Sequence, residues 1–156
     1  GVADGGSVNS GDRIEVVLTL EVKNDLPYVL LEDLKPAGFE AVALKSGEPL
    51  VARQLNREAI SRRFERSGTD EPFQGPDANR GPRADETGKT LPVHQELREQ
   101  LIALFIDDLP QGVWEIRYQL LAETPGVFHG LPLVGEAMYA PHLRANSAEQ
   151  RVEILE

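Results

Sequence analysis

Residues 113–122, VWEIRYQLLA, alternate between two kinds of side chain at every second position. One face of the expected strand carries mostly large apolar residues, namely Trp114, Ile116, Tyr118, Leu120 and Ala122. The other face is more polar and carries Val113, Glu115, Arg117, Gln119 and Leu121. Because side chains along a β-strand point alternately to opposite faces, this pattern predicts a strand with one face in a hydrophobic core. Trp114, the single tryptophan, is expected in that core.

Shorter stretches on both sides show similar patterns between turn signals. Every second residue is apolar from Ile14 to Val22, and further strands are expected at 28–33, 39–44, 101–106, 127–129, 136–139 and 150–155. About seven or eight strands without a strand–helix–strand rhythm predict an all-β fold, an antiparallel β-sandwich. The predicted core comprises Ile14, Val16, Leu18, Leu20, Leu30, Phe39, Leu104, Trp114, Ile116, Tyr118, Leu120, Val152 and Ile154.

The pattern is lost between residues 45 and 92, which we interpret as an irregular insertion. Residues 67–90 are rich in glycine, proline and charged residues, so this part is expected to be flexible. Within 54–66, apolar residues recur about one helical turn apart, which predicts one short amphipathic helix. The basic side chains of that segment form a candidate patch for docking an acidic neighbour, with a solvated face as the alternative: Arg57, Arg62, Arg63 and Arg66.

Length and charge narrow the class of protein. The 156 residues predict a single domain, 1–156, large enough for one core. The net charge of −10 argues against nucleic acid or an anionic membrane as the main partner, because phosphate binding needs a basic surface. Insertion into a membrane is not expected either, because the sequence has no run of about 18 apolar residues. There is no cysteine, so disulfides and cysteine nucleophiles are excluded. The chain starts at Gly1 without a methionine or an export signal, and we expect it to be part of a longer protein.

No motif predicts catalysis, a metal or a cofactor. The Gly88-Lys89-Thr90 sequence lacks the preceding glycine spacing of a phosphate-binding loop. The three histidines, His94, His129 and His142, have no metal-ligand spacing. The acidic pairs 32–33 and 107–108 are consecutive residues, which face opposite sides of a strand or form turns. An enzyme is therefore not expected.

Several short motifs follow one another in order outside residues 45–92. They are Gly11-Asp12-Arg13, the stretch 31–41 (LEDLKPAGFEA), the stretch 104–114 (LFIDDLPQGVW), Tyr118, the stretch 124–129 (TPGVFH) and the stretch 136–141 (EAMYAP). Together they resemble the C-terminal domain of bacterial alpha-2-macroglobulins. The resemblance covers nearly the whole chain apart from the insertion.

This resemblance implies a terminal macroglobulin-like β-sandwich, equivalent in position to the receptor-binding domain of the vertebrate proteins. The parent would be a periplasmic or extracellular protease inhibitor, associated with the cell envelope. It would trap a protease that cuts its bait region. The partners implied are the neighbouring domains of the parent, a thioester domain if present, and the target proteases. The family's thioester needs a cysteine, so it would lie in another domain.

The resemblance also implies a role for two residues. Met138 and Tyr139 match a pair that is thought to cover the thioester in bacterial relatives and to keep water from it. A thioether and an aromatic ring suit this role because both exclude water. The alternative is that both residues are packing residues at a strand end.

A rival interpretation is a β-sandwich adhesion or carbohydrate-binding module of a surface protein. Such a module would show an exposed aromatic platform or a cluster of carboxylates that binds calcium. With five Phe, three Tyr and one Trp, most of them needed for the core, the sequence offers few residues for such a platform.

Overall fold

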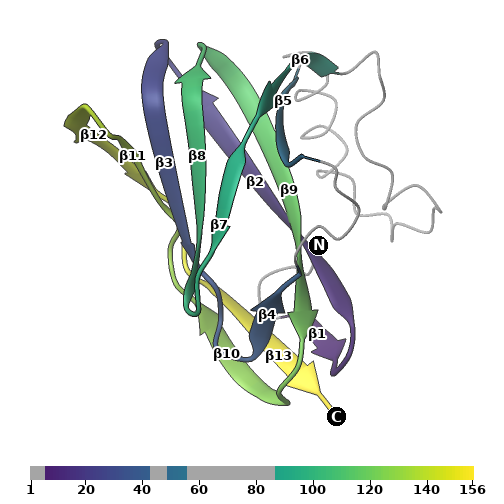
Figure 1. The fold of residues 1–156 in the computed structure, drawn as a ribbon. Helices are drawn as coiled ribbons and strands as arrows, with labels where there is room; N and C mark the ends of the chain where they lie inside the picture. Colours follow the sequence, from purple (N-terminus) through teal and green to yellow (C-terminus); the bar gives the residue numbers. More distant parts are fainter. Residues whose placement is uncertain (1–5, 43–48, 56–86) are drawn as a thin grey trace, which may run out of the picture.

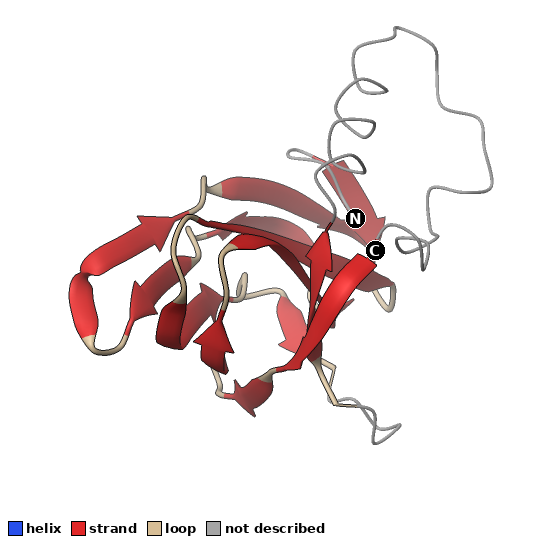
Figure 2. Cartoon of the chain, turned by 90° about the horizontal axis from the view of Figure 1, so that it is seen from above, coloured by secondary structure: helices blue, strands red, loops and turns tan. Residues whose placement is uncertain are grey.

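A computed structural model describes residues 6–42, 49–55 and 87–156 of the chain. The described part consists of strands, turns and loops, without a helix (Figures 1 and 2). The strands are β1 (Gly6–Asn9), β2 (Arg13–Val22), β3 (Leu26–Leu34), β4 (Phe39–Ala41), β5 (Val51–Leu55), β6 (Thr87–Pro92), β7 (His94–Leu97), β8 (Leu101–Leu109), β9 (Gly112–Ala122), β10 (Gly126–Gly130), β11 (Val134–Ala137), β12 (Ala140–Asn146) and β13 (Gln150–Leu155). The predicted all-β fold is therefore confirmed.

The strands form three sheets. The β3 sheet has the order β12-β11-β3-β8-β7, and the β9 sheet has the order β2-β9-β5-β6 with β4 paired to the end of β9. These two sheets pack face to face and enclose most of the core (Figure 1). A third, small sheet has the order β1-β13-β10 and lies at the end where the chain terminates (Figure 1). The chain thus forms the expected sandwich, with a three-stranded extension at one end.

Residues 113–122 lie in β9, and the face predicted by their alternation is the buried one. Strand β9 pairs with β2 in an antiparallel register that places Trp114 opposite Leu20 and Tyr118 opposite Val16. Trp114 and Ile116 are fully buried, and the indole Nε1 of Trp114 donates a hydrogen bond to the carbonyl oxygen of Pro110 at 2.8 Å. Burial of the ring together with satisfaction of its polar N–H makes this side chain an anchor of the sandwich.

All but one of the thirteen predicted core residues lie in the observed core or against it, but within the described part of the chain the prediction missed eleven other buried residues of that core, among them Leu31, Ile102 and Ile106. Seven of the predicted residues are buried, and five more pack against them while partly exposed: Ile14, Val16, Leu18, Leu20 and Val152. Leu30 was expected in the core and does not belong to it. It pairs with Phe105 between the buried residues Val29 and Leu31, and therefore faces away from the core. A strand that is apolar on both faces gives no signal for choosing the buried one.

The prediction that 45–92 is irregular is wrong at two places. Residues 51–55 form β5, which pairs with β9, and residues 87–92 form β6 on the outer side of β5. Leu50 and Val93 next to these strands are buried, so the segment contributes to the core. Hydrogen bonding to an existing sheet makes strands of sequences whose own pattern is weak. The predicted helix falls on 54–66, of which Gln54 and Leu55 lie in β5 and the rest lies outside the described residues.

More strands are present in the described part than the seven or eight expected. The additional ones are short: β1, β5, β6, β7 and β12. One pairing also departs from the antiparallel pattern, because β1 runs parallel to β13. None of the described segments is a helix long and apolar enough to cross a membrane.

Candidate functional site

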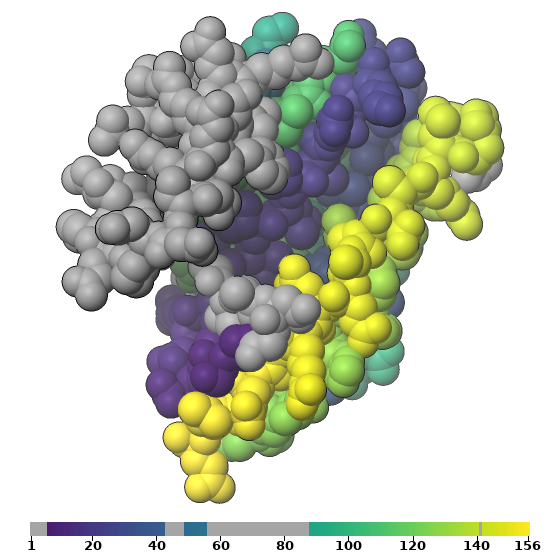
Figure 3. Space-filling model, turned by 180° about the vertical axis from the view of Figure 1, so that it is seen from behind, coloured from purple at the N-terminus to yellow at the C-terminus, as the bar shows by residue number. Residues whose placement is uncertain are grey.

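The hairpin β11–β12 carries the two residues singled out by the sequence. Met138 and Tyr139 form the turn between Ala137 and Ala140, which pair with each other at its base. Ala137 is buried, whereas Met138 is 49% and Tyr139 76% exposed. The end of the hairpin projects from the edge of the β3 sheet (Figures 1 and 3). The predicted strand at 136–139 therefore ends two residues early, and both side chains are presented to the outside.

Pairing with β3 fixes the hairpin to the sandwich, and an ion pair joins its own two strands. Strand β11 pairs with β3 over four residues, from Val134 opposite Glu32 to Ala137 opposite Val29. Across the hairpin, Arg144 Nη2 lies 2.8 Å from Glu136 Oε2 in an ion pair. The register shifts between Glu136 and Ala137, an irregularity of the kind that redirects side chains at functional edges. The turn is thus a defined projection of the sheet.

Tyr28 in β3 completes the surface at the tip. Its ring lies against that of Tyr139, with centroids 5.0 Å apart and an angle of 76° between the planes. Its carbonyl oxygen accepts a hydrogen bond from the Met138 N–H at 2.8 Å. We call Tyr28, Met138 and Tyr139 the hairpin-tip surface. The sequence pattern marks Tyr28 only as the first residue of a strand, because alternation carries no information on which distant turn will reach it.

The second candidate site does not fall within the described part of the chain. Arg57, Arg62, Arg63 and Arg66 all belong to residues 56–86, outside the described ranges. Their role as a docking patch stays a prediction.

The histidines do not converge. His94 lies in β7 and His142 in β12, which are the two opposite edges of the β3 sheet, while His129 lies in β10 of the small sheet. His129 Nδ1 is 2.6 Å from Glu149 Oε1, and both side chains are exposed. In the described ranges there is no group of three His, Asp or Glu residues placed to hold a metal ion. Gly88, Lys89 and Thr90 lie in β6, an edge strand of the β9 sheet, and therefore in a strand and not in a loop.

The acidic pair of β3 is divided between the two faces of its sheet, as expected for consecutive residues. Glu32 pairs with Ala103 and Asp33 with Ile102, so Asp33 points to the same side as the buried residue Leu31. Burial raises the pKa of Asp33 from 3.8 to about 6, because removal from water disfavours the charged form.

This shift predicts a pH dependence of stability that is specific to Asp33. The folded chain holds its proton up to about pH 6 and the unfolded chain only up to about pH 4. The stabilisation that the protonated Asp33 gives the folded chain is therefore fully present below pH 4 and is lost as the pH rises through about 6. Two pKa units correspond to about 3 kcal/mol. Urea unfolding at pH 4 and pH 7 measures the free energy of unfolding of the wild type and of Asp33→Asn. Relative to the wild type, the variant should be more stable at pH 7 than at pH 4 by about this amount. Equal differences at both pH values would contradict it.

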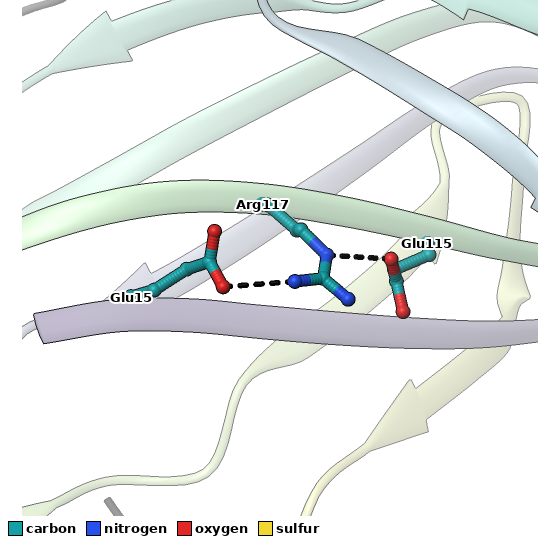
Figure 4. Close-up of polar contacts among 3 residues, drawn as sticks. All are labelled: Glu15, Glu115 and Arg117. Atoms are coloured by element: carbon teal, nitrogen blue, oxygen red, sulfur yellow. Dashed lines mark hydrogen bonds and ion pairs between the residues drawn. The ribbon is translucent and has the colours of Figure 1, made fainter. Parts of the chain in front are cut away.

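A charged cluster lies on the outer face of the β9 sheet (Figure 4). Arg117 Nε donates to Glu115 Oε1 at 2.6 Å, and its Nη1 donates to Glu15 Oε2 at 2.8 Å on the neighbouring strand β2. Glu115 is 1% exposed although it faces away from Trp114. Burial by itself lowers the pKa of Arg117, but the hydrogen bonds and negative charges of both glutamates raise it overall. Arg117 stays charged, and its contact with Glu15 ties β2 to β9, a structural arrangement.

The family comparison and the comparison with solved structures both give bacterial alpha-2-macroglobulins. Residues 2–142 match the family described as bacterial alpha-2-macroglobulin MG10 domain. No curated protein matches the chain. Among solved structures, Salmonella alpha-2-macroglobulin reacted with methylamine is similar over 99% of this chain and 9% of its own, with 20% identity and a TM-score of 0.62.

Two structures from Escherichia coli are similar to the same degree. Trypsin-activated alpha-2-macroglobulin matches 96% of this chain and 9% of its own, with 20% identity and a TM-score of 0.61. The native protein from domain MG7 to the C-terminus matches 99% of this chain and 22% of its own, with 20% identity and a TM-score of 0.60. At this identity the structures establish the shared fold. This chain spans about a tenth of the length of the larger relatives.

Proposed function

The chain belongs to the bacterial alpha-2-macroglobulin MG10 domain family, and from this membership we propose that it is a non-catalytic module of a protease-trapping inhibitor. In this proposal residues 1–156 form one terminal macroglobulin-like domain, equivalent to the receptor-binding domain of the vertebrate proteins. It docks on a neighbouring domain of its parent through the hairpin-tip surface. Met138 and Tyr139 there cover a thioester and keep water from it.

The observation that carries the proposal is the exposure of these two side chains on an ordered projection. Tyr139 is 76% exposed while the core aromatics Trp114 and Phe39 are fully buried. A large apolar side chain held away from the core by a paired hairpin contributes little to folding, and such exposed groups mark interaction sites. Burying a residue of this size against a partner stabilises the contact by about 1.5 to 3 kcal/mol.

The proposed partners of the chain follow from its membership of this family. The larger relatives are about ten times longer than this chain, and this chain contains no cysteine, so in this proposal a thioester, if the parent has one, lies in another domain of the parent. We propose that this domain and the target proteases of the parent are the partners, in the periplasm or outside the cell. The net charge of −10 disfavours nucleic acid.

The geometry of the exposed aromatics argues against the carbohydrate-binding alternative. A sugar platform needs rings that share a plane, whereas Tyr28 and Tyr139 meet at 76°. A calcium-dependent adhesion module needs several carboxylates in one place, and the described ranges contain no such group. Neither observation favours the rival function.

The test is the rate at which methylamine inactivates the thioester of the full-length parent. In the double variant Met138→Ala plus Tyr139→Ala the reaction should be at least about tenfold faster, because about 1.4 kcal/mol of protection corresponds to a factor of ten. The loss of two apolar side chains opens the electrophile to the amine. The rate is followed by thiol release and by loss of protease trapping.

Val127→Ala provides the matched control for this test. Val127 is an apolar residue, 47% exposed, in β10 of the small sheet, away from the hairpin. Its replacement should leave the methylamine rate at the wild-type value. If the double variant folds normally and reacts no faster than this control, the shielding role is wrong and the domain is a structural or partner-docking module.

A further inference from the structure

We propose that Tyr28 is a positioning residue that holds Tyr139 in the orientation needed for docking. The inference rests on the proposed function of the hairpin tip and adds a third residue to it. Tyr28 lies on β3, more than 100 residues before the hairpin in the sequence, and no motif connects it to Met138 or Tyr139. The argument comes from its backbone, its two contacts and its exposure.

The backbone of Tyr28 is strained. Its φ angle of 51° lies in the left-handed region, and it is the one residue other than glycine with a positive φ in the described ranges. Side chains with a Cβ disfavour this region because the Cβ approaches the following carbonyl oxygen. The strain occurs within a paired strand, between Pro27 opposite Asp108 and Val29 opposite Ile106. The surrounding sheet therefore imposes the conformation, as is common at functional sites.

Two contacts join this strained residue to the tip. The backbone contact is the hydrogen bond from the Met138 N–H to the Tyr28 carbonyl oxygen at 2.8 Å, which continues the ladder between β3 and β11 by one residue. The side-chain contact is the edge-to-face pair with Tyr139, a favourable arrangement for two aromatic rings. Tyr28 therefore holds both the backbone of the turn and the ring that follows it.

The exposure of Tyr28 separates this role from a packing role. The side chain is 48% exposed and does not belong to the hydrophobic core. Glycine would adopt the same backbone without strain, so a tyrosine here is not explained by the needs of the strand. An ordered Tyr139 loses less rotational freedom on docking than a free one, which favours association by preorganisation.

The first measurement uses the 156-residue chain, whose own sheets enclose the core. It has three tyrosines, so aromatic NMR signals can be assigned with Tyr118→Phe and Tyr139→Phe. In the wild type and in Tyr28→Phe, ring-to-ring NOEs to residue 139 should be present. In Tyr28→Leu and Tyr28→Gly, which have no ring for such an NOE, the Tyr139 ring signals should move toward free-tyrosine positions. Unchanged Tyr139 signals in both variants would overturn the proposal.

The second measurement is methylamine inactivation of the full-length parent. Tyr28→Leu should react about threefold to tenfold faster, the range set by the energy of an aromatic pair, and Tyr28→Phe should react like the wild type. Combined with Tyr139→Ala, Tyr28→Leu should add nothing further. An additive increase would overturn positioning, because Tyr28 would then act independently.

The two measurements separate the inference from the function on which it rests. If Tyr139→Ala leaves the methylamine rate unchanged, the shielding function fails. The NMR signals still decide whether Tyr28 orders Tyr139.

Discussion

Replacing Trp114 with alanine is expected to lower the free energy of unfolding by about 4 kcal/mol. The ring is fully buried between the sheets, and its Nε1 is hydrogen-bonded to Pro110 at 2.8 Å. Its removal leaves a large cavity and one carbonyl without its donor. Because domains of this size are stable by about 5 to 15 kcal/mol, the change consumes a large share of the total.

The measurement is urea unfolding followed by far-UV circular dichroism, since the variant lacks the only tryptophan for fluorescence. Trp114→Phe is the matched control, because it fills much of the same volume and loses only the hydrogen bond and part of the packing. It should cost clearly less than the alanine variant. A loss below about 1 kcal/mol in Trp114→Ala would show that Trp114 does not anchor the core.

Replacing Arg117 with methionine is expected to cost about 3 kcal/mol. The change keeps an apolar stem over the sheet but removes the guanidinium that bonds Glu115 at 2.6 Å and Glu15 at 2.8 Å. Glu115 is 1% exposed, so its carboxylate then loses a charge partner in a place that water does not reach. Chemical denaturation at pH 7 measures the loss.

Two further variants test the cause of this loss. Glu15→Gln should cost less than about 1 kcal/mol, because the Glu15 side chain is 35% exposed and water replaces part of the interaction. Arg117→Lys should cost less than Arg117→Met, because the ammonium group keeps a positive charge beside the two glutamates. An Arg117→Lys variant that is no more stable than Arg117→Met would contradict the role assigned to the charge.

Some features of the fold could be predicted because they depend on side chains along one strand. The alternation in 113–122 identified the buried face of β9, and the alternation after Arg13 identified that of β2. These two strands pair over ten residues, with β2 at one edge of the β9 sheet and β9 inside it. Local periodicity is sufficient here because each strand has one apolar and one more polar face.

Other features could not be predicted because they depend on partners distant in sequence. Leu30 is apolar in an apolar strand, and only its pairing with Phe105 decides which face it occupies. Strand β5 forms by pairing with the edge of β9, and β6 forms by pairing with β5, although the sequence of neither strand shows a strand pattern of its own. The number of strands and the parallel pair β1–β13 follow from the same tertiary contacts.

The candidate site was likewise predicted in part from the sequence and decided in part by tertiary contacts. Family motifs in the sequence were sufficient to select Met138 and Tyr139, but not to show whether they are buried or exposed. Their exposure depends on where β11 stops pairing with β3, and the contact with Tyr28 depends on a backbone conformation that leaves no mark in the pattern.

The sequence by itself determined an all-β sandwich, the buried faces of β2 and β9 and part of the core, because these follow from the period of side chains along a strand. The tertiary structure alone decided that Met138 and Tyr139 project from the sheet edge and that the Tyr28 ring lies against that of Tyr139. The physical reason is that exposure and ring contact arise from the pairing of β3 with β11, two strands about 100 residues apart, and no local pattern encodes such a pairing.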